Sequence, residues 1–450
     1  MIGNLLEKTK FENLNLNSPL LKVLNEEGYD YPTPIQFQTI PSALQGSDIL
    51  GVAQTGTGKT AAFTLPILQK LNSTQSRDKF RHPKAIILSP TRELAIQINN
   101  SIKIYAKYIA LKHIAVFGGV KQGPQVALLN KGVDIIVATP GRLLDLINQK
   151  LCSLGEIKYF VLDEADRMLD MGFIRDIEKI VNLLPKKRQS LFFSATMPKT
   201  VAKLADNILK NPKKVKVKSS VTPIDRISQS VIVIEPQEKI SQLVTLLNDN
   251  TLKSVIVFIK TKHKANRLSQ KLTQIGIVTD VIHSNKSQSA RQKALNDFKE
   301  GKIKILLATD IAARGIDVEA VSHIINFDMP STPEDYVHRI GRTARAGANG
   351  IAISLCEPSE RLKLFRIEEL INIKLNIIKS ERSKLELIEN FSENNQNSNK
   401  SEVRNANFSK IKKIKSLKVV AKKTKSIIKR NAKKDKLKSK KKKVERKING

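Results

Sequence analysis

The sequence predicts an α/β protein with two consecutive parallel sheets and a basic C-terminal segment. Three observations predict this fold class. Short runs of Val, Ile and Leu end in glycine or polar residues and alternate with longer amphipathic segments, which is typical of buried parallel strands with covering helices. The alternation lapses between Lys210 and Arg226 and then resumes. It stops after about Ile378, where the chain becomes rich in Asn, Ser and Lys.

The first predicted domain spans residues 1–210. Its strands are expected in five apolar runs, which are followed by glycine or polar residues: DILGVAQTG, AIILSPTREL, VDIIVATPGR, YFVLDEAD and SLFFSAT. Residues 211–226 are rich in Lys, Ser and Pro, which suits a linker. The linker separates two domains that each supply their own core.

The second predicted domain spans residues 227–378. The same strand rhythm returns there in five runs: SVIVFIK, TDVIHS, KILLATD, VSHIINFD and GIAISL. Each run is again followed by polar residues and a helical pattern. We therefore expect a second parallel sheet covered by helices.

Residues 379–450 are expected to form a disordered, lysine-rich tail. The chain has a formal net charge of +36, and from Lys400 to Gly450 there are 22 Lys and Arg against 3 Asp and Glu. Self-repulsion and low apolar content prevent such a block from forming a core. Nucleic acid is the favoured partner because a polyanion relieves the repulsion and releases counterions. The alternative is a solvated tail that reflects a general bias toward Lys, Ile and Asn.

Composition excludes several other classes of protein. No stretch approaches the roughly 20 apolar residues needed to span a bilayer, and the first residues lack the pattern of a secretory signal. We therefore expect a cytoplasmic protein. The only two cysteines, Cys152 and Cys356, lie in different predicted domains, so neither a disulfide framework nor a cysteine metal site is indicated.

A phosphate-binding loop is predicted at residues 53–60, which read AQTGTGKT. Glycines there allow backbone N–H groups to approach phosphate oxygens at a helix N-terminus. Lys59 would reach the β and γ phosphates, and the Thr60 hydroxyl would bind Mg²⁺. Ala at the first position keeps a small side chain. The candidate ATP-binding residues of this loop are Ala53, Gln54, Thr55, Gly56, Thr57, Gly58, Lys59 and Thr60.

An acidic motif follows the apolar run YFVL about a hundred residues later. A strand that ends in Asp presents the carboxylate at the edge of the sheet where open α/β folds bind ligands. Asp163 can hold Mg²⁺ through water, and Glu164 can orient and deprotonate the attacking water. Alternatively, these acids only stabilise a helix N-terminus through the helix dipole and have no catalytic role.

With these motifs the chain resembles the DEAD-box RNA helicases of superfamily 2, over roughly residues 11 to 370. The resemblance implies two tandem RecA-like domains, ATP with Mg²⁺ as cofactors, and RNA as the partner. GYDYPTPIQ resembles the family's Q motif, in which Gln36 would read adenine and the upstream Phe11 would stack on it. Without the resemblance, Phe11 reads more simply as a hydrophobic anchor.

Further motifs of the first domain resemble the family's RNA-facing segments. Thr hydroxyls, Gly amides and Arg guanidinium groups address phosphates and 2′-hydroxyls, not bases, so binding is expected to be largely independent of sequence. Taken alone, Arg92 and Glu93 read as a surface ion pair or a helix start. Ser194 and Thr196 of the SAT motif, with Asp166, would couple hydrolysis to domain closure. The predicted RNA contacts are Pro90, Thr91, Arg92, Gly118, Gly119, Thr139 and Arg142.

The second domain carries the remaining motifs of the resemblance, QSAR, ATDIAARGID and HRIGRTAR. Arg342 and Arg345 would be arginine fingers on the transferring phosphoryl group, with Lys59 and Glu164 as their catalytic partners in the first domain. The catalytic site would therefore be incomplete until the domains close. The other predicted residues are Arg291 toward RNA, Thr309 and Arg314 toward RNA or the domain interface, Asp317 toward the ribose and His338 for coupling.

One position departs from the family pattern, because Ala344 stands where the family commonly has glycine. If the position requires φ > 0, Ala costs about 1 kcal/mol. The exact residues of three motifs suggest the bacterial RhlE-type subgroup: DEADRMLDMGF, FFSATMP and HSNKSQSARQKAL.

The sequence thus predicts a monomeric, ATP-dependent RNA helicase that unwinds short duplexes or remodels RNA–protein complexes, in ribosome assembly or RNA decay. Ribosomal particles and RNA-decay proteins are therefore expected partners. Three alternatives remain open: an RNA clamp that unwinds nothing, a DNA helicase of the same superfamily and a small-molecule kinase.

Overall fold

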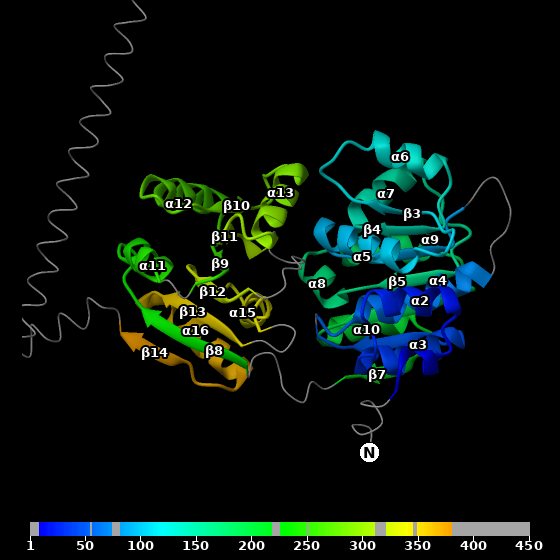
Figure 1. Ribbon diagram of the computed structural model, residues 1–450, viewed down its shortest axis with the longest axis horizontal. Coiled ribbons are helices and arrows are strands. Elements are labelled where there is room, and N and C mark those ends of the chain that lie inside the picture. The colour runs from blue at the N-terminus through cyan, green and yellow to red at the C-terminus, as the bar shows by residue number, and fades with distance from the viewer. Residues whose placement is uncertain are drawn as a thin grey trace, which may run out of the picture. The chain divides into compact units, whose positions relative to one another are not determined.

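The computed structural model describes residues 9–54, 56–73, 82–217, 226–249, 252–310, 321–344 and 349–379. They form two seven-stranded sheets in which every pair of neighbouring strands is parallel. Figure 1 shows helices packed against each sheet. The predicted α/β class with two parallel sheets is confirmed. The tail expected at 379–450 lies, from residue 380 on, outside the described residues.

The first sheet has the strand order β3-β4-β2-β5-β6-β1-β7. All five apolar runs predicted for this domain form strands. The strands are β1 (Ile49–Val52), β2 (Ala85–Leu88), β3 (His113–Val116), β4 (Ile135–Ala138), β5 (Tyr159–Leu162), β6 (Gln189–Ser194) and β7 (Lys213–Lys216).

Helices cover both faces of this sheet, and a separate apolar core lies under each face. Side chains such as Phe63 and Ile98 fill one core, and Leu143 and Ile177 fill the other. One core receives η1 (Phe11–Leu14), α2 (Ser18–Glu26), α3 (Pro34–Leu44), α4 (Lys59–Ser73) and α5 (Arg92–Tyr105). The other lies on the side of α7 (Pro140–Asn148), α8 (Ala165–Asp170), α9 (Ile174–Leu183) and α10 (Lys199–Ile208), and α6 (Gly123–Asn130) packs on β3.

The second sheet repeats this plan with the order β10-β11-β9-β12-β13-β8-β14. Its strands are β8 (Ile227–Val233), β9 (Val255–Phe258), β10 (Asp280–Ile282), β11 (Ile305–Ala308), β12 (His323–Asn326), β13 (Gly350–Cys356) and β14 (Asn376–Lys379). The helices are α11 (Lys239–Leu247), α12 (Lys262–Gln274), α13 (Gln288–Lys299), α15 (Pro333–Ile340) and α16 (Arg361–Ile371), with the short η3 (Pro358–Glu360).

The parallel arrangement decides where functional residues gather. Central strands such as β2 and β4 are buried at every position, so polar side chains first occur where a strand ends. Because all strands point the same way, those ends lie together at the carboxyl edge of each sheet, where open α/β folds bind ligands.

The linker expectation needs one correction. Residues 213–216, which the sequence assigned to a connection, form β7 at the edge of the first sheet, paired with β1. Val215 is buried in the core while its lysine neighbours are exposed. A single inward residue in a lysine-rich run is too weak an alternation to predict a strand. Residues 218–225 of the expected linker lie outside the described residues.

Within the described part of the chain, we find no helix with both the length and the apolar character required to cross a membrane.

Candidate functional site

The phosphate-loop residues follow β1 and lead into α4. Gly56 and Gly58 have φ of +83° and +90°, a conformation that glycine adopts without the strain of a Cβ. A Cβ on Gly58 would also lie 2.4 Å from the Gln36 amide nitrogen. Lys59 is 6% exposed, and its ammonium donates a hydrogen bond of 2.9 Å to the carbonyl of Ala53. Thr55 lies outside the described residues.

Gln36 connects the segment before α3 to this loop. Its side-chain oxygen accepts a hydrogen bond from the Thr33 backbone N–H at 2.8 Å, and its amide nitrogen donates to the Gly58 carbonyl at 3.2 Å. The side chain therefore caps α3 and supports the phosphate loop at the same time. The sequence alone gave no sign of this second contact.

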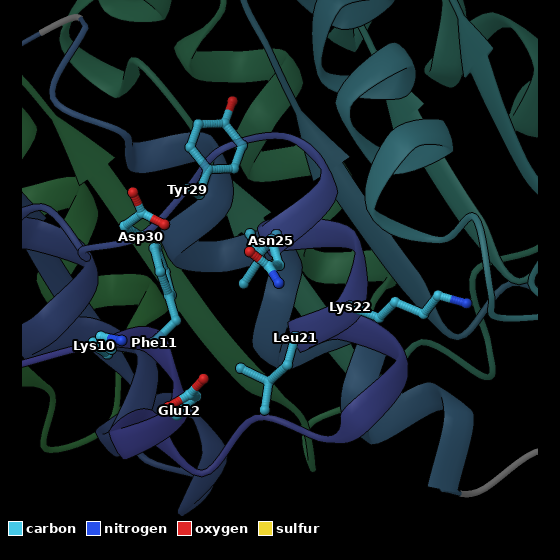
Figure 2. A pocket seen from close by; sticks show the side chains of 9 residues that line it. Lys10, Phe11, Glu12, Leu21, Lys22, Asn25, Tyr29 and Asp30 are labelled. Carbon is cyan, nitrogen blue, oxygen red and sulfur yellow. The ribbon is translucent and has the colours of Figure 1, made fainter.

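Phe11 is buried in the first core, with 4% of its surface exposed. It also lines a cavity of about 320 Å³ between η1, α2 and the segment that follows α2. Figure 2 shows this cavity, to which Leu21, Asn25 and Tyr29 also contribute. The position of Phe11 is thus that of a hydrophobic anchor with one side on a pocket.

The acidic motif follows β5. Glu164 has φ +53°, and its backbone N–H donates to the Asp163 carboxylate at 3.0 Å. The buried Arg167 guanidinium binds the Glu164 carboxylate at 2.5 Å. The two acids are therefore held at the carboxyl edge with a cation already in contact with one of them.

The electrostatic environments of the two acids differ. Burial raises the pKa of the Asp163 carboxyl above its usual value, and Lys59 opposes that shift. Burial also acts against the charge of Glu164, but Arg167, Lys59 and Arg342 hold the pKa of that carboxyl well below its usual range. Glu164 is thus ionised, which a general base requires.

The donors present suit a magnesium ion. Asp163 supplies carboxylate oxygens whose charge a cation would stabilise against burial, and Thr60 supplies a hydroxyl. This fits Mg²⁺, which is commonly held by one or two carboxylates together with substrate phosphates and water.

Three predicted coupling residues contact one another directly. The backbone N–H and the hydroxyl of Thr196 donate to the Asp166 carboxylate at 2.8 and 2.9 Å. Ser194 accepts from the Asp166 backbone N–H at 3.2 Å and donates to the Thr196 carbonyl at 2.7 Å. The motif after β6 is therefore tied to the acidic motif after β5. His338, the fourth predicted coupling residue, lies in α15.

The predicted RNA-facing residues of the first domain lie after β2, β3 and β4. Thr91 caps α5 and Thr139 precedes α7. The Arg92 guanidinium packs over Gly119, where a Cβ would come within 2.0 Å of it. Arg142 donates to the Val120 carbonyl at 3.3 Å. Pro90 and Gly118 complete the group, and all seven residues gather at one edge of the sheet.

Arg291, which the sequence assigned to RNA, has a different partner. Its guanidinium forms a 2.9 Å ion pair with Glu93, and Gln288 donates to the same carboxylate at 3.0 Å. Glu93 is 3% exposed and Arg291 is 6% exposed. These residues begin α5 of the first domain and α13 of the second, so the pair joins the two domains. The structure thus gives Arg291 a contact between domains, and its predicted contact with RNA stays a prediction.

The sequence missed Glu93 and Gln288 for a physical reason. An acid in the first turn of a helix is favoured by the helix dipole whatever it touches. Only the fold brings a residue 195 positions away against it.

The remaining second-domain residues are only partly described. Arg342 is 4% exposed and donates to the His338 carbonyl at 3.3 Å. Thr309 follows β11. Arg314, Asp317 and Arg345 lie outside the described residues.

Ala344 has φ +56°, the conformation that favours glycine, and its methyl group is buried in the second domain. We expect Ala344→Gly to change the melting temperature by less than about 4 °C. The backbone strain released, about 1 to 2 kcal/mol, is offset by loss of about 0.8 kcal/mol of methyl burial and by the freer unfolded glycine chain. Thermal unfolding checks this. Ala344→Val, with a β-branched side chain, should lower the melting temperature clearly, and equal stability of the Val variant would contradict the strained backbone.

Comparisons with known proteins agree with this geometry. Residues 33–204 match the family described as DEAD/DEAH box helicase, and residues 238–347 match the helicase conserved C-terminal domain. A DEAD-box ATP-dependent RNA helicase, CshA of Bacillus subtilis, is 42% identical over 82% of this chain and 74% of its own. The ATP-dependent RNA helicase CshA of Listeria monocytogenes is 43% identical over 80% of this chain and 68% of its own.

A solved structure shares the arrangement as well. Dbp5 of S. cerevisiae, bound to RNA and ADP BeF3, has a TM-score of 0.74 at 32% identity, covering 84% of this chain and 98% of that one. The RhlE-type subgroup expected from the wording of the motifs is not supported, because these bacterial relatives are CshA proteins. From the two matched domains and the identity to these relatives, the chain belongs to the DEAD/DEAH box helicase family.

Proposed function

We propose that this protein is an ATP-dependent RNA helicase that closes two domains around ATP and RNA, separates short duplexes locally and releases RNA after hydrolysis. The observation that carries the proposal is the pair of links between the domains. Arg342 of the second domain acts on the pKa of Glu164 in the first, and Arg291 pairs with Glu93. One link lies at the catalytic acid and the other at the start of a predicted RNA-facing helix.

Within this proposal the first domain binds the nucleotide. Backbone N–H groups of the phosphate loop and the Lys59 ammonium bind the phosphates. Gln36 and Phe11 face the adenine. Gln36 retains hydrogen-bonding capacity beyond its contacts with Thr33 and Gly58, because each atom of an amide side chain can make two hydrogen bonds. Mg²⁺, held by Thr60 and Asp163, would neutralise charge on the phosphates.

Glu164 is the proposed general base, and Arg342 with Arg345 would stabilise the transferring phosphoryl group. In the structure the Glu164 carboxylate is bound by Arg167. A carboxylate has several acceptor sites on its two oxygens. It can therefore keep Arg167 on one oxygen and accept a proton from the attacking water on the other.

RNA is proposed to lie across the carboxyl edges of both sheets. Arg92, Arg142 and the glycines at 118 and 119 would contact its backbone, with Thr309 and Arg314 on the second domain. Contacts of this kind fix position without reading bases. ATP and RNA would each favour the closed arrangement, and so bind cooperatively.

The Glu93–Arg291 pair supplies a direct test in a strand-displacement assay. The wild-type protein should displace one strand of a short RNA duplex repeatedly with ATP, but not with a non-hydrolysable analogue. Glu93→Gln and Arg291→Gln should each slow displacement about 10-fold, and the double variant should be no slower than the worse single variant, because both changes remove one shared pair. ATP affinity without RNA is the control and should be unchanged.

Three outcomes would contradict the proposal or part of it. RNA-stimulated ATP hydrolysis without any strand displacement would favour the clamp. Stronger stimulation by single-stranded DNA than by RNA would favour a DNA helicase. If the losses in displacement rate were additive in the double variant, the Glu93–Arg291 pair would not act as one unit in strand displacement.

We also propose that the protein acts as a monomer in the cytoplasm, on ribosomal particles or RNA destined for decay. The RNA helicase names of its relatives support RNA as the target. Crosslinking to cellular RNA followed by sequencing tests the proposed targets. Footprints that fall outside both ribosomal RNA and RNA destined for decay would overturn them.

A further inference from the structure

The amino-terminal edge of the first sheet, opposite the nucleotide loop, has a strong positive charge. The connections that lead from a helix into the next strand enter at this edge. Their described residues contain ten Lys and Arg against three Asp and Glu. The cations are Lys84, Lys107, Lys112, Lys131, Lys150, Lys158, Lys186, Lys187, Arg188 and Lys210, and the acids are Asp48, Asp134 and Glu156.

Hydrogen bonds show that cations on one half of this edge are neighbours. The Lys112 ammonium donates to the Lys131 carbonyl at 3.4 Å. The backbone N–H of Lys84 donates to Asp134, in the same connection as Lys131, at 2.9 Å. The Lys158 N–H in turn donates to the Lys84 carbonyl at 2.7 Å. These contacts run from the β3 side of the sheet to β5.

The line of neighbouring cations continues along the other half of this edge. The Lys158 carbonyl accepts from the Gln189 N–H at 2.9 Å, next to Lys186 and Lys187. The Lys210 ammonium donates to the Lys186 carbonyl at 3.1 Å. The row thus crosses the whole sheet from β3 to β7, which is about 29 Å at the usual 4.8 Å between strands.

The acids of this edge leave the row largely uncompensated. Asp48 is 8% exposed and accepts the backbone N–H groups of Ser190 and Lys210. Asp134 is 9% exposed and accepts the Lys112 N–H. Glu156 forms an ion pair with Lys84. Among the described residues, no ion pair involves the exposed side chains of Lys112, Lys131, Lys158, Lys186, Lys187 or Lys210.

We infer that this amino-edge row, the six exposed lysines just named, is a second binding surface for the RNA backbone. It would hold RNA that extends beyond the segment at the carboxyl edge, and so lengthen the time that long substrates stay bound. A line of ammonium groups along a sheet edge is suited to a polyanionic strand. An anionic membrane is less suited, because stable membrane binding combines basic charge with a buried apolar face or a lipid chain. The inference rests on RNA being the substrate, as proposed above.

The test compares two full-length variants with equal loss of charge. One replaces Lys112, Lys131, Lys158, Lys186 and Lys187 by Gln. The control replaces five exposed lysines elsewhere: Lys179, Lys203, Lys253, Lys271 and Lys299. Fluorescence anisotropy measures affinity, over a series of salt concentrations, for single-stranded RNA of about 10 and about 40 nucleotides, the shorter being within the range of a single binding site.

The row variant should bind the longer RNA about 10-fold more weakly than the control. The slope of the logarithm of its RNA affinity against the logarithm of salt concentration should be shallower by about 3, because each single-strand phosphate contact contributes about 0.7 to that slope. Affinity for the shorter RNA, and ATP hydrolysis saturated with it, should match the control. Loss of that hydrolysis in both variants would point to failure of the proposed function instead.

Three results would overturn the inference. The row variant could match the control on the longer RNA. It could lose affinity equally for both lengths, which would mean general electrostatic attraction. It could bind both RNAs normally but lose binding to vesicles containing anionic lipid, which would assign the row to a membrane surface.

Discussion

Glu164→Gln is expected to lower RNA-stimulated ATP hydrolysis by about 10² to 10⁴, the range that a positioned general base contributes. Glutamine keeps the shape of the side chain and can still accept a hydrogen bond from Arg167, which lies at 2.5 Å from the carboxylate. It cannot accept a proton at neutral pH. Steady-state hydrolysis with saturating RNA measures the effect.

Binding should respond differently from turnover in this variant. RNA affinity in the presence of ATP should be retained or increased, because closure persists when hydrolysis is blocked. Glu178→Gln, an exposed position on α9, is the matched control and should behave like the wild type. Loss of ATP-dependent RNA binding in Glu164→Gln, or unchanged hydrolysis, would contradict the assignment of Glu164 as base.

Arg342→Lys is expected to lower hydrolysis about 10³-fold, within the range given by loss of an arginine finger. Lysine keeps one positive charge but lacks the planar fork that contacts two oxygens at once. Arg342 of the second domain helps to lower the pKa of Glu164 in the first. The substitution should therefore lower kcat measured with RNA present. Affinity for ATP in the absence of RNA should change less than about 3-fold.

Arg267→Lys, at an exposed position of α12, is the corresponding control and should leave hydrolysis unchanged. If Arg342→Lys instead abolished ATP binding to the RNA-free protein, Arg342 would be a ground-state phosphate ligand. Unchanged kcat would exclude it from the chemistry.

Local sequence was sufficient to predict those features that depend on residues within a single strand or loop. Continuous apolar runs predicted β2, β4 and β5 because strands buried on both faces need apolar side chains at every position. The phosphate loop and the acidic motif were found because their chemistry depends on residues adjacent in the chain. Their joint position at one edge followed from parallel topology.

Local sequence was insufficient where partners are distant. Glu93 and Gln288 are 195 positions apart, which leaves no periodic signal, and neither side chain is unusual at a helix start. The strand at 213–216 was missed because only Val215 faces the core. The amino-edge row was hidden for the same reason, since its lysines come from five separate connections and become neighbours only through the sheet order.

The edge strand β7 also bounds how far the domains can separate. Val217, directly after it, donates a backbone hydrogen bond to Val52 at the end of β1. Only the eight residues 218–225 separate Val217 from Arg226, which precedes β8. Since an extended chain covers at most about 3.6 Å per residue, those two residues cannot be more than about 32 Å apart. A tether this short holds the arginine-bearing domain at millimolar effective concentration beside the nucleotide loop, so each new cycle begins with an intramolecular encounter.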